Sequence, residues 1–284
     1  MKFCLVDDSV NFLGGTSLTL DAIIEPNKKN VTFVSTMDFS LKDVFSFDFF
    51  IFGNTTNLNS NSLQSILHCM DEKDFCKIDF DYGYCKYRGD IPHEILGGEA
   101  CSCPESHSHL DKLYKKIKDR AKFNFFMSRE QMEMHQSKLG KSNNDLVLSS
   151  CFTKETMLEF KKLKDKKKNG RYAIIDGQGG WHTQAKGINE SIAYAQDNNL
   201  NFDLIKTKTY QEMLDLLSNY YGLISMPIIH DTCPRITIEA RYMGLKVLTN
   251  KYSQHITEDW WKSSNEEAFA FTSGRPDFFW DTIK

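Results

Sequence analysis

The sequence predicts an α/β protein built from two parallel-sheet domains, and three observations lead to this prediction. The 284 residues are enough for two domains of about 150 residues each. In both halves, short apolar segments alternate with amphipathic ones, as strands and helices do in parallel sheets. The charged stretch at residues 161–170 separates the halves. We therefore expect two doubly wound domains that face a cleft, with ligands at the carboxyl ends of the strands.

The first half alternates strands with helices. Apolar, β-prone segments predict strands at residues 2–7, 31–35, 45–52, 77–84, 123–127 and 146–149. Helical spacing predicts one helix ending at residue 24 and others over 63–70, 110–121 and 129–139. Thr16 or Ser17 can cap the first helix and Ser128 the last, with Gly140 as the stop signal of the latter.

The second half repeats the pattern. Strands are expected at residues 172–176, 203–206, 222–227 and 246–249, and helices over 188–198, 209–218 and 234–243. The predicted domains are therefore residues 1–155 and 156–270. Residues 271–284, which are rich in aromatic side chains, are expected to pack back towards the first domain.

Composition and charge argue against several classes of protein. Hydrophobic residues make up 40% and charged residues 26%, which is typical of a globular chain. No apolar run reaches about 18 residues, so no transmembrane helix is expected. A net charge of -3 argues against a general nucleic-acid binder. Asp7 and Asp8 follow the first apolar run at once, unlike a signal peptide, and we expect a cytoplasmic protein with reduced cysteines.

Residues 225–250 carry the clearest chemical pattern. A strand leads into a polar loop with Asp231, Thr232 and Cys233, and Pro234 suits the first position of the helix that follows. The loop thus presents a carboxylate beside a helix N-terminus, which attracts phosphate.

Two side chains of that helix add polar chemistry. Arg235, in the first turn, can form a forked contact with phosphate oxygens. Glu239, one turn further, can accept hydrogen bonds from hydroxyl groups.

This stretch resembles the donor-nucleotide site of GT-B glycosyltransferases, especially glycosyltransferase family four. That family has an acidic residue, seven intervening residues, Glu-Ala, a helix, a glycine and an apolar strand. Asp231, Glu239-Ala240 and Gly244 take those places here. Asp231 stands where Glu is usual, and Pro234 stands where a glycine often lends its amide. The DTCPR form, with a Cys/His-rich first half, resembles a subgroup found in bacteria and their viruses.

Two more segments resemble the family in the expected order. Lys186-Gly187 opens a helix at the place where the family's lysine contacts the donor pyrophosphate. Trp181 stands where the family usually has an arginine. Gly14-Gly15, after the first strand, is similar to the family's glycine loop near the donor phosphate and the acceptor.

The resemblance implies an enzyme with two Rossmann-like domains that moves a sugar from a nucleotide-diphosphate sugar to an acceptor, with retention of configuration. Glu239 would bind the ribose and Asp231 the sugar. Lys186, Arg235 and the backbone amides after Asp231 would neutralise the leaving diphosphate. The leaving phosphate can take the acceptor proton, and no metal is needed for transfer.

The acceptor would be a glycan, a lipid-linked sugar or a small molecule placed by the first domain. Asp81 lies in the last part of the strand predicted there over residues 77–84 and would act with Gly14 and Gly15. One alternative is a viral enzyme that glycosylates hydroxymethylated DNA bases, supported only by the basic run at residues 161–168. Two further hypotheses are a non-catalytic module that binds nucleotide sugars and a sugar-nucleotide epimerase of the same fold.

A second cluster lies in the first half. Cys85, His93, Cys101 and Cys103 fall within nineteen residues. Three thiolates and one imidazole would suit a structural zinc ion. The spacing lacks paired Cys-x-x-Cys knuckles, and the competing hypothesis is a loop with reduced thiols and a surface histidine.

Overall fold

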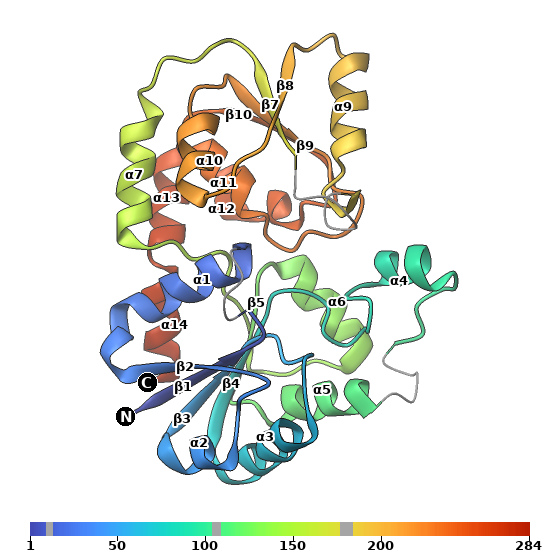
Figure 1. Ribbon diagram of the computed structural model, residues 1–284, viewed down its shortest axis with the longest axis vertical. Helices are drawn as coiled ribbons and strands as arrows, with labels where there is room; N and C mark the ends of the chain where they lie inside the picture. Colours follow the sequence, from blue (N-terminus) through green and yellow to red (C-terminus); the bar gives the residue numbers. More distant parts are fainter. Residues whose placement is uncertain (10–13, 104–108, 177–183) are drawn as a thin grey trace. The chain divides into compact units, whose positions relative to one another are not determined.

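The computed structural model describes residues 1–9, 14–103, 109–176 and 184–284 of the chain (Figure 1). It divides into two compact units. The first contains Met1–Cys151 together with Gly274–Lys284, and the second contains Phe152–Ser273.

The first unit is built on a six-stranded sheet in the order β2-β1-β3-β4-β5-β6, in which all neighbouring strands are parallel. The strands are β1 Phe3–Asp7, β2 Val31–Ser35, β3 Phe49–Phe52, β4 Asp74–Asp79, β5 Phe123–Phe126 and β6 Asp145–Val147. The strand order reverses between β1 and β3. In such sheets the ligand crevice lies outside the carboxyl ends of the strands at this point.

Helices connect these strands. They are α1 Gly15–Ile24, the 3₁₀ helix η1 Glu25–Asn30, α2 Leu41–Ser46, α3 Ser60–Glu72, α4 Asp90–Gly97, α5 His109–Arg120 and α6 Arg129–Leu139. The hydroxyl of Ser128 caps α6 as predicted, accepting a hydrogen bond from the Gln131 amide at 3.1 Å. The predicted cap of α1 is wrong: Gly14 is its N-cap, and Ser17 lies in its first turn.

The last helix of the chain, α14 Arg275–Ile283, belongs to the first unit and lies beside α1 (Figure 1). The indole of Trp280 donates a hydrogen bond to the Ile23 carbonyl at 2.6 Å, and its ring lies 4.8 Å from that of Phe3. Arg275 donates to the Leu148 carbonyl at 2.6 Å. These contacts fix the chain end against β1, α1 and the segment after β6.

The second unit has a four-stranded parallel sheet in the order β10-β9-β7-β8. Its strands are β7 Tyr172–Ile175, β8 Phe202–Ile205, β9 Gly222–Ser225 and β10 Lys246–Thr249. Its helices are α7 Lys154–Lys164, α9 Ile188–Asp197, α10 Tyr210–Leu217, α11 Arg235–Tyr242, the 3₁₀ helix η2 Gln254–Thr257, α12 Asp259–Lys262 and α13 Asn265–Ser273. Here the strand order reverses between β7 and β9, which again marks the ligand edge.

Burial follows the pattern of covered parallel sheets. Every residue of β1 and β3 is buried, because helices cover the sheet on both faces. The central core of the first unit contains Cys4, Val6, Phe39, Phe50, Phe52, Ile66 and Phe75. In the second unit, a core cluster contains Tyr172, Ile174, Ala195, Ile224 and Met226. The predicted fold class, two parallel-sheet α/β domains, is therefore confirmed.

Two predicted strands are wrong in part. The strand predicted over residues 77–84 is observed as β4 Asp74–Asp79, so residues 80–84 lie outside the sheet. The sequence predicts a single strand over residues 45–52, but the chain is helical up to Ser46 and enters the sheet only at Phe49. Phe45 is 71% exposed because it lies on α2 and does not enter the sheet.

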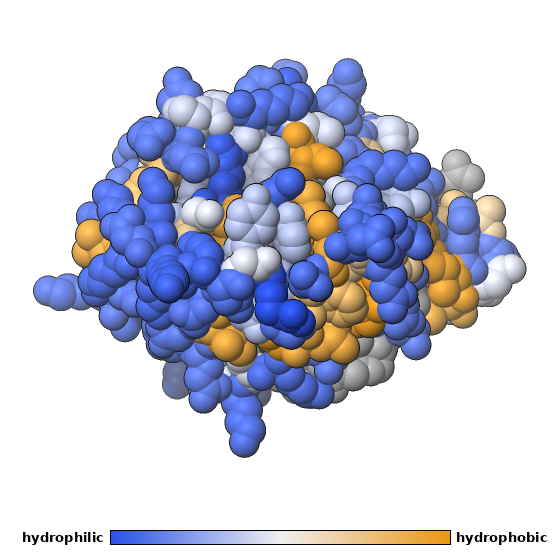
Figure 2. Space-filling view, turned by 90° about the horizontal axis from the view of Figure 1, so that it is seen from above, coloured by the Kyte–Doolittle hydropathy of each residue, from blue (hydrophilic) through white to orange (hydrophobic). Residues whose placement is uncertain are grey.

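The helices that the structure describes include none with the length and apolar content needed to span a bilayer. On the face shown in Figure 2, hydrophilic side chains predominate and hydrophobic ones gather in patches between them.

Candidate functional site

The ligand edge of the second unit brings Gly187 against the end of β9. Gly187 has a φ of +67°, and a Cβ there would lie 1.6 Å from the Met226 carbonyl oxygen. The Ile228 amide donates to the Ala185 carbonyl at 3.1 Å, which joins the two segments. Only glycine fits this position, so the chain before α9 lies directly beside the switch between β7 and β9. Trp181, just upstream, lies outside the described residues.

Lys186 and Asp231 form an ion pair at this edge. The Lys186 Nζ lies 2.5 Å from Asp231 Oδ2. The lysine side chain is 63% exposed, while that of the aspartate is 14% exposed. The backbone of Asp231 is held by two hydrogen bonds, to the Tyr252 carbonyl at 2.8 Å and from the Gln254 amide at 3.0 Å. A fixed carboxylate and a solvent-facing cation thus lie side by side.

Thr232, Cys233 and Pro234 form the short connection from Asp231 to α11, and their side chains are buried. Pro234 is the N-cap of this helix, with a ψ of 107°, and the first helical residue is Arg235. The prediction that Pro234 takes the first helical position is therefore wrong by one residue.

Arg235 and Glu239 face each other across one turn of α11. The Arg235 Nε lies 3.4 Å from Glu239 Oε1, and both side chains are less than a tenth exposed. The guanidinium of Arg235 also lies over the Phe152 ring, 4.1 Å from its centroid. Tyr210, the first residue of α10, donates its hydroxyl hydrogen bond to Glu239 Oε1 at 2.8 Å.

Burial is the main influence on the pKa values of Glu239 and Tyr210. It raises the pKa of Glu239, while the Arg235 charge and the Tyr210 hydrogen bond lower it by less. Burial and the Glu239 carboxylate also raise the pKa of Tyr210. The sequence pattern did not indicate Tyr210, because its role depends on a contact between α10 and α11 that no local motif encodes.

The ligand edge of the first unit carries a buried carboxylate at the end of β1. Asp7 is fully buried, and its two oxygens accept hydrogen bonds from the Ser9 and Asn54 amides, each at 2.6 Å. A Cβ on Gly53 would lie 2.1 Å from Asp7 Oδ2, so the end of β3 approaches this carboxylate closely. Burial raises the pKa of Asp7 despite the hydrogen bonds and the Lys77 charge.

Next to Asp7, a polar network links three loops. Asp8 Oδ2 accepts hydrogen bonds from the amide of Thr56 at 2.8 Å and from its hydroxyl at 2.7 Å. Arg88 donates through Nη2 to the same hydroxyl at 2.8 Å and pairs through Nη1 with the Asp81 carboxylate. The predicted acceptor residue Asp81 thus belongs to a network whose other members the sequence did not indicate.

The backbone of Asp81 is held by α6. The Gln131 side-chain amide donates to the carbonyl oxygens of Asp79 and Asp81 at 3.0 and 2.9 Å. His135 Nε2 lies 3.2 Å from the Asp81 carbonyl oxygen. These contacts place Asp81 just beyond the carboxyl end of β4.

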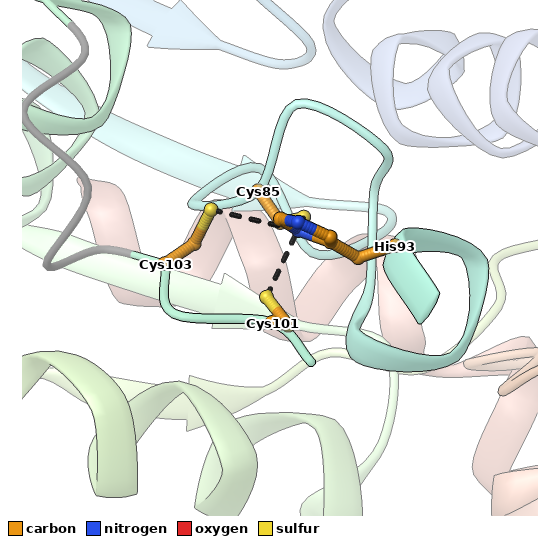
Figure 3. Close-up of side chains that lie close together, drawn as sticks. All are labelled: Cys85, His93, Cys101 and Cys103. Atoms are coloured by element: carbon orange, nitrogen blue, oxygen red, sulfur yellow. Dashed lines mark hydrogen bonds between the residues drawn. The ribbon is translucent and has the colours of Figure 1, made fainter. Parts of the chain in front are cut away.

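The remaining predicted residues lie elsewhere in the first unit. Gly14 and Gly15 are exposed at the start of α1, and a Cβ on Gly14 would meet no described atom within 4 Å. Cys85, His93, Cys101 and Cys103 converge in a separate cluster (Figure 3).

The basic run at residues 161–168 is largely engaged with its own unit. Lys162 pairs with Glu159 at 3.0 Å, and Lys166 with Asp215 at 3.5 Å. Lys168 donates to two backbone carbonyl oxygens at 2.7 and 3.0 Å. An open groove of about 680 Å³ beside the run is lined by Lys166, Lys206, Thr207, Lys208, Glu212, Asp215, Leu216 and Asn219. Its mixture of charges does not form a continuous cationic surface.

Three solved structures resemble the chain over nearly its whole length. The first is Anabaena HepE in complex with UDP and glucose, with a TM-score of 0.56, 10% identity, and coverage of 98% of this chain and 94% of that one. UDP-N-acetylglucosamine 2-epimerase from Rickettsia bellii has a TM-score of 0.53 and 10% identity, and the match covers 99% of this chain and 95% of that one. The Neisseria meningitidis enzyme of the same name, bound to UDP-GlcNAc, has a TM-score of 0.51 and 12% identity, with coverage of 100% and 99%.

No protein-family model matches the chain, and the search of curated proteins gives no match. The structural likenesses therefore establish the fold alone: the chain has two parallel-sheet α/β domains of the GT-B type.

Proposed function

We propose that the chain is a glycosyltransferase that transfers a sugar, with retention, from a nucleotide-diphosphate sugar to an acceptor. The observation that carries this proposal is the Lys186–Asp231 pair at the switch between β7 and β9. An exposed cation beside a fixed carboxylate, followed by a helix N-terminus, suits a ligand that has both a diphosphate and hydroxyl groups. The similarity of fold to a protein in complex with UDP and glucose supports the same class of donor.

In this proposal, binding of the donor breaks the ion pair between Lys186 and Asp231. Lys186 leaves Asp231 and contacts the diphosphate, and Asp231 accepts hydrogen bonds from the sugar. The N-terminus of α11, reached through Thr232, Cys233 and Pro234, adds the positive end of its dipole. Lys186 and this helix N-terminus stabilise the negative charge on the leaving diphosphate. A phosphate oxygen of the leaving group takes the acceptor proton, and no metal takes part.

Glu239 is assigned to the ribose hydroxyls. Its Oε1 contacts Arg235 and Tyr210, so we assign Oε2 to the ribose. Because Glu239 is only 1% exposed, its carboxylate must move outward slightly when the donor binds. Arg235, whose charge lowers the pKa of this carboxylate, is then a positioning residue. We assign it no contact with the diphosphate, the role that the sequence suggests, because its side chain is only 7% exposed.

The first unit is assigned to the acceptor, which is a glycan, a lipid-linked sugar or a small molecule. Asp81 and Arg88 offer an acceptor and a donor of hydrogen bonds at the ligand edge of its sheet. Gly14, the N-cap of α1, and Gly15, its first residue, are assigned to the acceptor or the donor phosphate, and a Cβ on Gly14 would meet no described atom within 4 Å.

The test is release of UDP or GDP from their sugars, measured with and without sugar acceptors. We expect Asp231→Asn to abolish transfer while UDP still binds, because the lysine that contacts the diphosphate remains. Asp215→Asn, which removes another ion-paired aspartate of the same unit, should leave transfer unchanged. Binding of nucleotide without any release would instead indicate a non-catalytic module, and equal activity of Asp231→Asn and wild type would contradict the site.

A second candidate is a sugar-nucleotide epimerase. Two structures named as UDP-GlcNAc 2-epimerases align with the chain over 95% and 99% of their own lengths. Incubation with UDP-GlcNAc and no acceptor, followed by NMR, separates the candidates, because an epimerase would produce the C2 epimer and a transferase would not.

DNA is a weaker partner in this proposal. The lysines at residues 162, 166 and 168 contact groups of their own unit. A glycosyltransferase acting on DNA would bind duplex DNA with a steep dependence on salt, which a filter-binding titration measures.

A further inference from the structure

The cysteine and histidine cluster of the first unit draws its side chains from three segments. Cys85 lies in the turn after β4, His93 on α4, and Cys101 and Cys103 in the chain that follows α4 (Figure 3). The potential ligand atoms of these four residues all lie within 4.8 Å of one another. Cys85, His93 and Cys103 are each about 3% exposed, and Cys101 is partly exposed.

Three distances between these atoms are close to the edges of a zinc tetrahedron. Bond lengths of about 2.3 Å to sulfur and about 2.0–2.1 Å to nitrogen place two sulfur ligands about 3.8 Å apart and a sulfur and a nitrogen about 3.6 Å apart. The Sγ atoms of Cys85 and Cys101 are 3.8 Å apart. The Nδ1 of His93 lies 3.3 Å from Cys85 Sγ and 3.9 Å from Cys103 Sγ. A disulfide would need a sulfur separation of about 2.05 Å.

The second nitrogen of His93 is also placed as in a metal site. Among the described residues, the buried Nε2 has no hydrogen-bond partner, but it lies 3.9 Å from the Glu99 carboxylate. A histidine that binds zinc through one nitrogen usually directs the other towards such a carboxylate. A small movement of the exposed Glu99 side chain would complete this contact.

The backbone brings the ligands together at two places where it adopts left-handed conformations. Arg88 has a φ of +61° and its amide donates to the Cys85 carbonyl at 2.8 Å, which closes the turn that carries Cys85. Gly98 ends α4 with a φ of +74° and lets the chain reverse towards His93. A non-glycine residue with positive φ is uncommon and costs free energy, so the turn at Arg88 needs support from its surroundings.

We propose that Cys85, Cys101 and Cys103, as thiolates, and His93, through Nδ1, bind a structural zinc ion. On binding, the three thiols release three protons to solvent, and the imidazole binds in its neutral form. The ion joins the turn after β4 to α4 and to the chain beyond it. Because Arg88 lies in that turn, the ion also fixes the arginine that pairs with Asp81. The metal site itself does not depend on the proposed transfer reaction.

Metal content of the purified full-length chain tests the proposal. We expect one zinc per chain by atomic emission, loss of that zinc in Cys101→Ser and Cys103→Ser, and its retention in Cys69→Ala, which removes a buried thiol elsewhere in the same unit. Replacement by Co²⁺ should give thiolate-to-metal charge-transfer bands. Zinc content that is unchanged in both serine variants would overturn the proposal.

A measurement on the wild-type chain covers the case in which the variants do not fold. We expect zinc to protect Cys85, Cys101 and Cys103 from alkylation and a chelator to expose them, as mass spectrometry of peptides would show. Reactivity that does not change with zinc or chelator, no cobalt charge-transfer band, or a Cys85–Cys101 disulfide in the freshly purified chain would each contradict the site.

Discussion

Arg235 and Glu239 form an ion pair within α11 whose side chains are only 7% and 2% exposed. Two charges buried in this way stabilise a protein little beyond what apolar residues would, but each depends strongly on the other. The pair therefore links the free energy of unfolding of the second unit to the protonation of Glu239.

Arg235→Met tests this link. Loss of the guanidinium leaves the Glu239 carboxylate buried without its cation, which should destabilise the protein by about 3–5 kcal/mol at neutral pH. Without Arg235, the pKa of Glu239 rises further, so the folded state binds a proton that the unfolded state releases. The free energy of unfolding of the variant should therefore recover as the pH falls towards 4.5, the ordinary value for glutamate.

Urea unfolding between about pH 8 and about pH 5 measures this effect. The control is the double variant Arg235→Met with Glu239→Gln, which removes both charges and should regain most of the lost stability at neutral pH. A loss in the single variant that is the same at every pH would show that packing on Phe152, and not the ion pair, explains it.

Gly187→Ala should destabilise the second unit strongly. Its Cβ would lie 1.6 Å from the Met226 carbonyl oxygen, a backbone atom that cannot move without shifting the end of β9. Gly170→Ala is the matched control, because Gly170 has a similar φ of +78° but no atom within 4 Å of its Cβ. We expect about 1 kcal/mol from the left-handed backbone alone in the control and at least about 3 kcal/mol in Gly187→Ala. Equal losses by urea unfolding would mean that the close approach to Met226 is not rigid.

The sequence predicted the fold class because apolar runs and helical spacing are local signals. The strand over residues 246–249 was predicted with its observed bounds. The strand predicted over residues 45–52 is too long. Aromatic residues favour a strand along the whole run, but only Phe49–Phe52 pairs with β1 and β4. Pairing across the sheet decides where that strand begins, and local composition does not show which residues pair.

In the candidate sites, too, local motifs can be recognised in the sequence and tertiary contacts cannot. Two separate motifs indicate Lys186 and Asp231, and the sheet brings these residues, 45 apart in sequence, within contact. Tyr210 and Arg88 were not predicted, because each contributes only through tertiary contacts with Glu239 and with Asp81. A tyrosine at the start of a helix and an arginine in a turn have no distinctive local pattern.

His255 should make the second unit sensitive to acid. This fully buried side chain has its pKa lowered to about 3, first by burial and then by the Arg241 charge. Between pH 6.5, the ordinary value, and about 3, the unfolded state binds a proton that the folded state does not. The free energy of unfolding should therefore fall as the pH falls below 6.5, by about 1.4 kcal/mol per pH unit from this residue.

Comparison with His255→Gln isolates this contribution, since the carboxylates titrate in both proteins. The difference in slope of unfolding free energy against pH should correspond to about one proton. The slope is informative even if the variant loses stability through its contact with Thr237, which the histidine makes at 3.1 Å. Parallel pH curves would show that His255 is protonated in the folded state or titrates normally there.

Lys186→Met should weaken the binding of UDP far more than it affects folding. A charge-assisted contact with a diphosphate contributes about 1.5–3 kcal/mol, which is at least a tenfold change in Kd by calorimetry. The melting temperature should hardly change, because the lysine is 63% exposed and an exposed ion pair contributes about 0–1 kcal/mol. Lys166→Met removes another ion-paired lysine of the same unit and should leave the Kd unchanged.

The binding of UDP to the wild type should also weaken as salt rises, and Lys186→Met should lose part of that dependence because one cation facing the phosphates is gone. If Lys186→Met binds UDP as the wild type does, the diphosphate does not lie at this edge of the sheet, whatever reaction the chain performs.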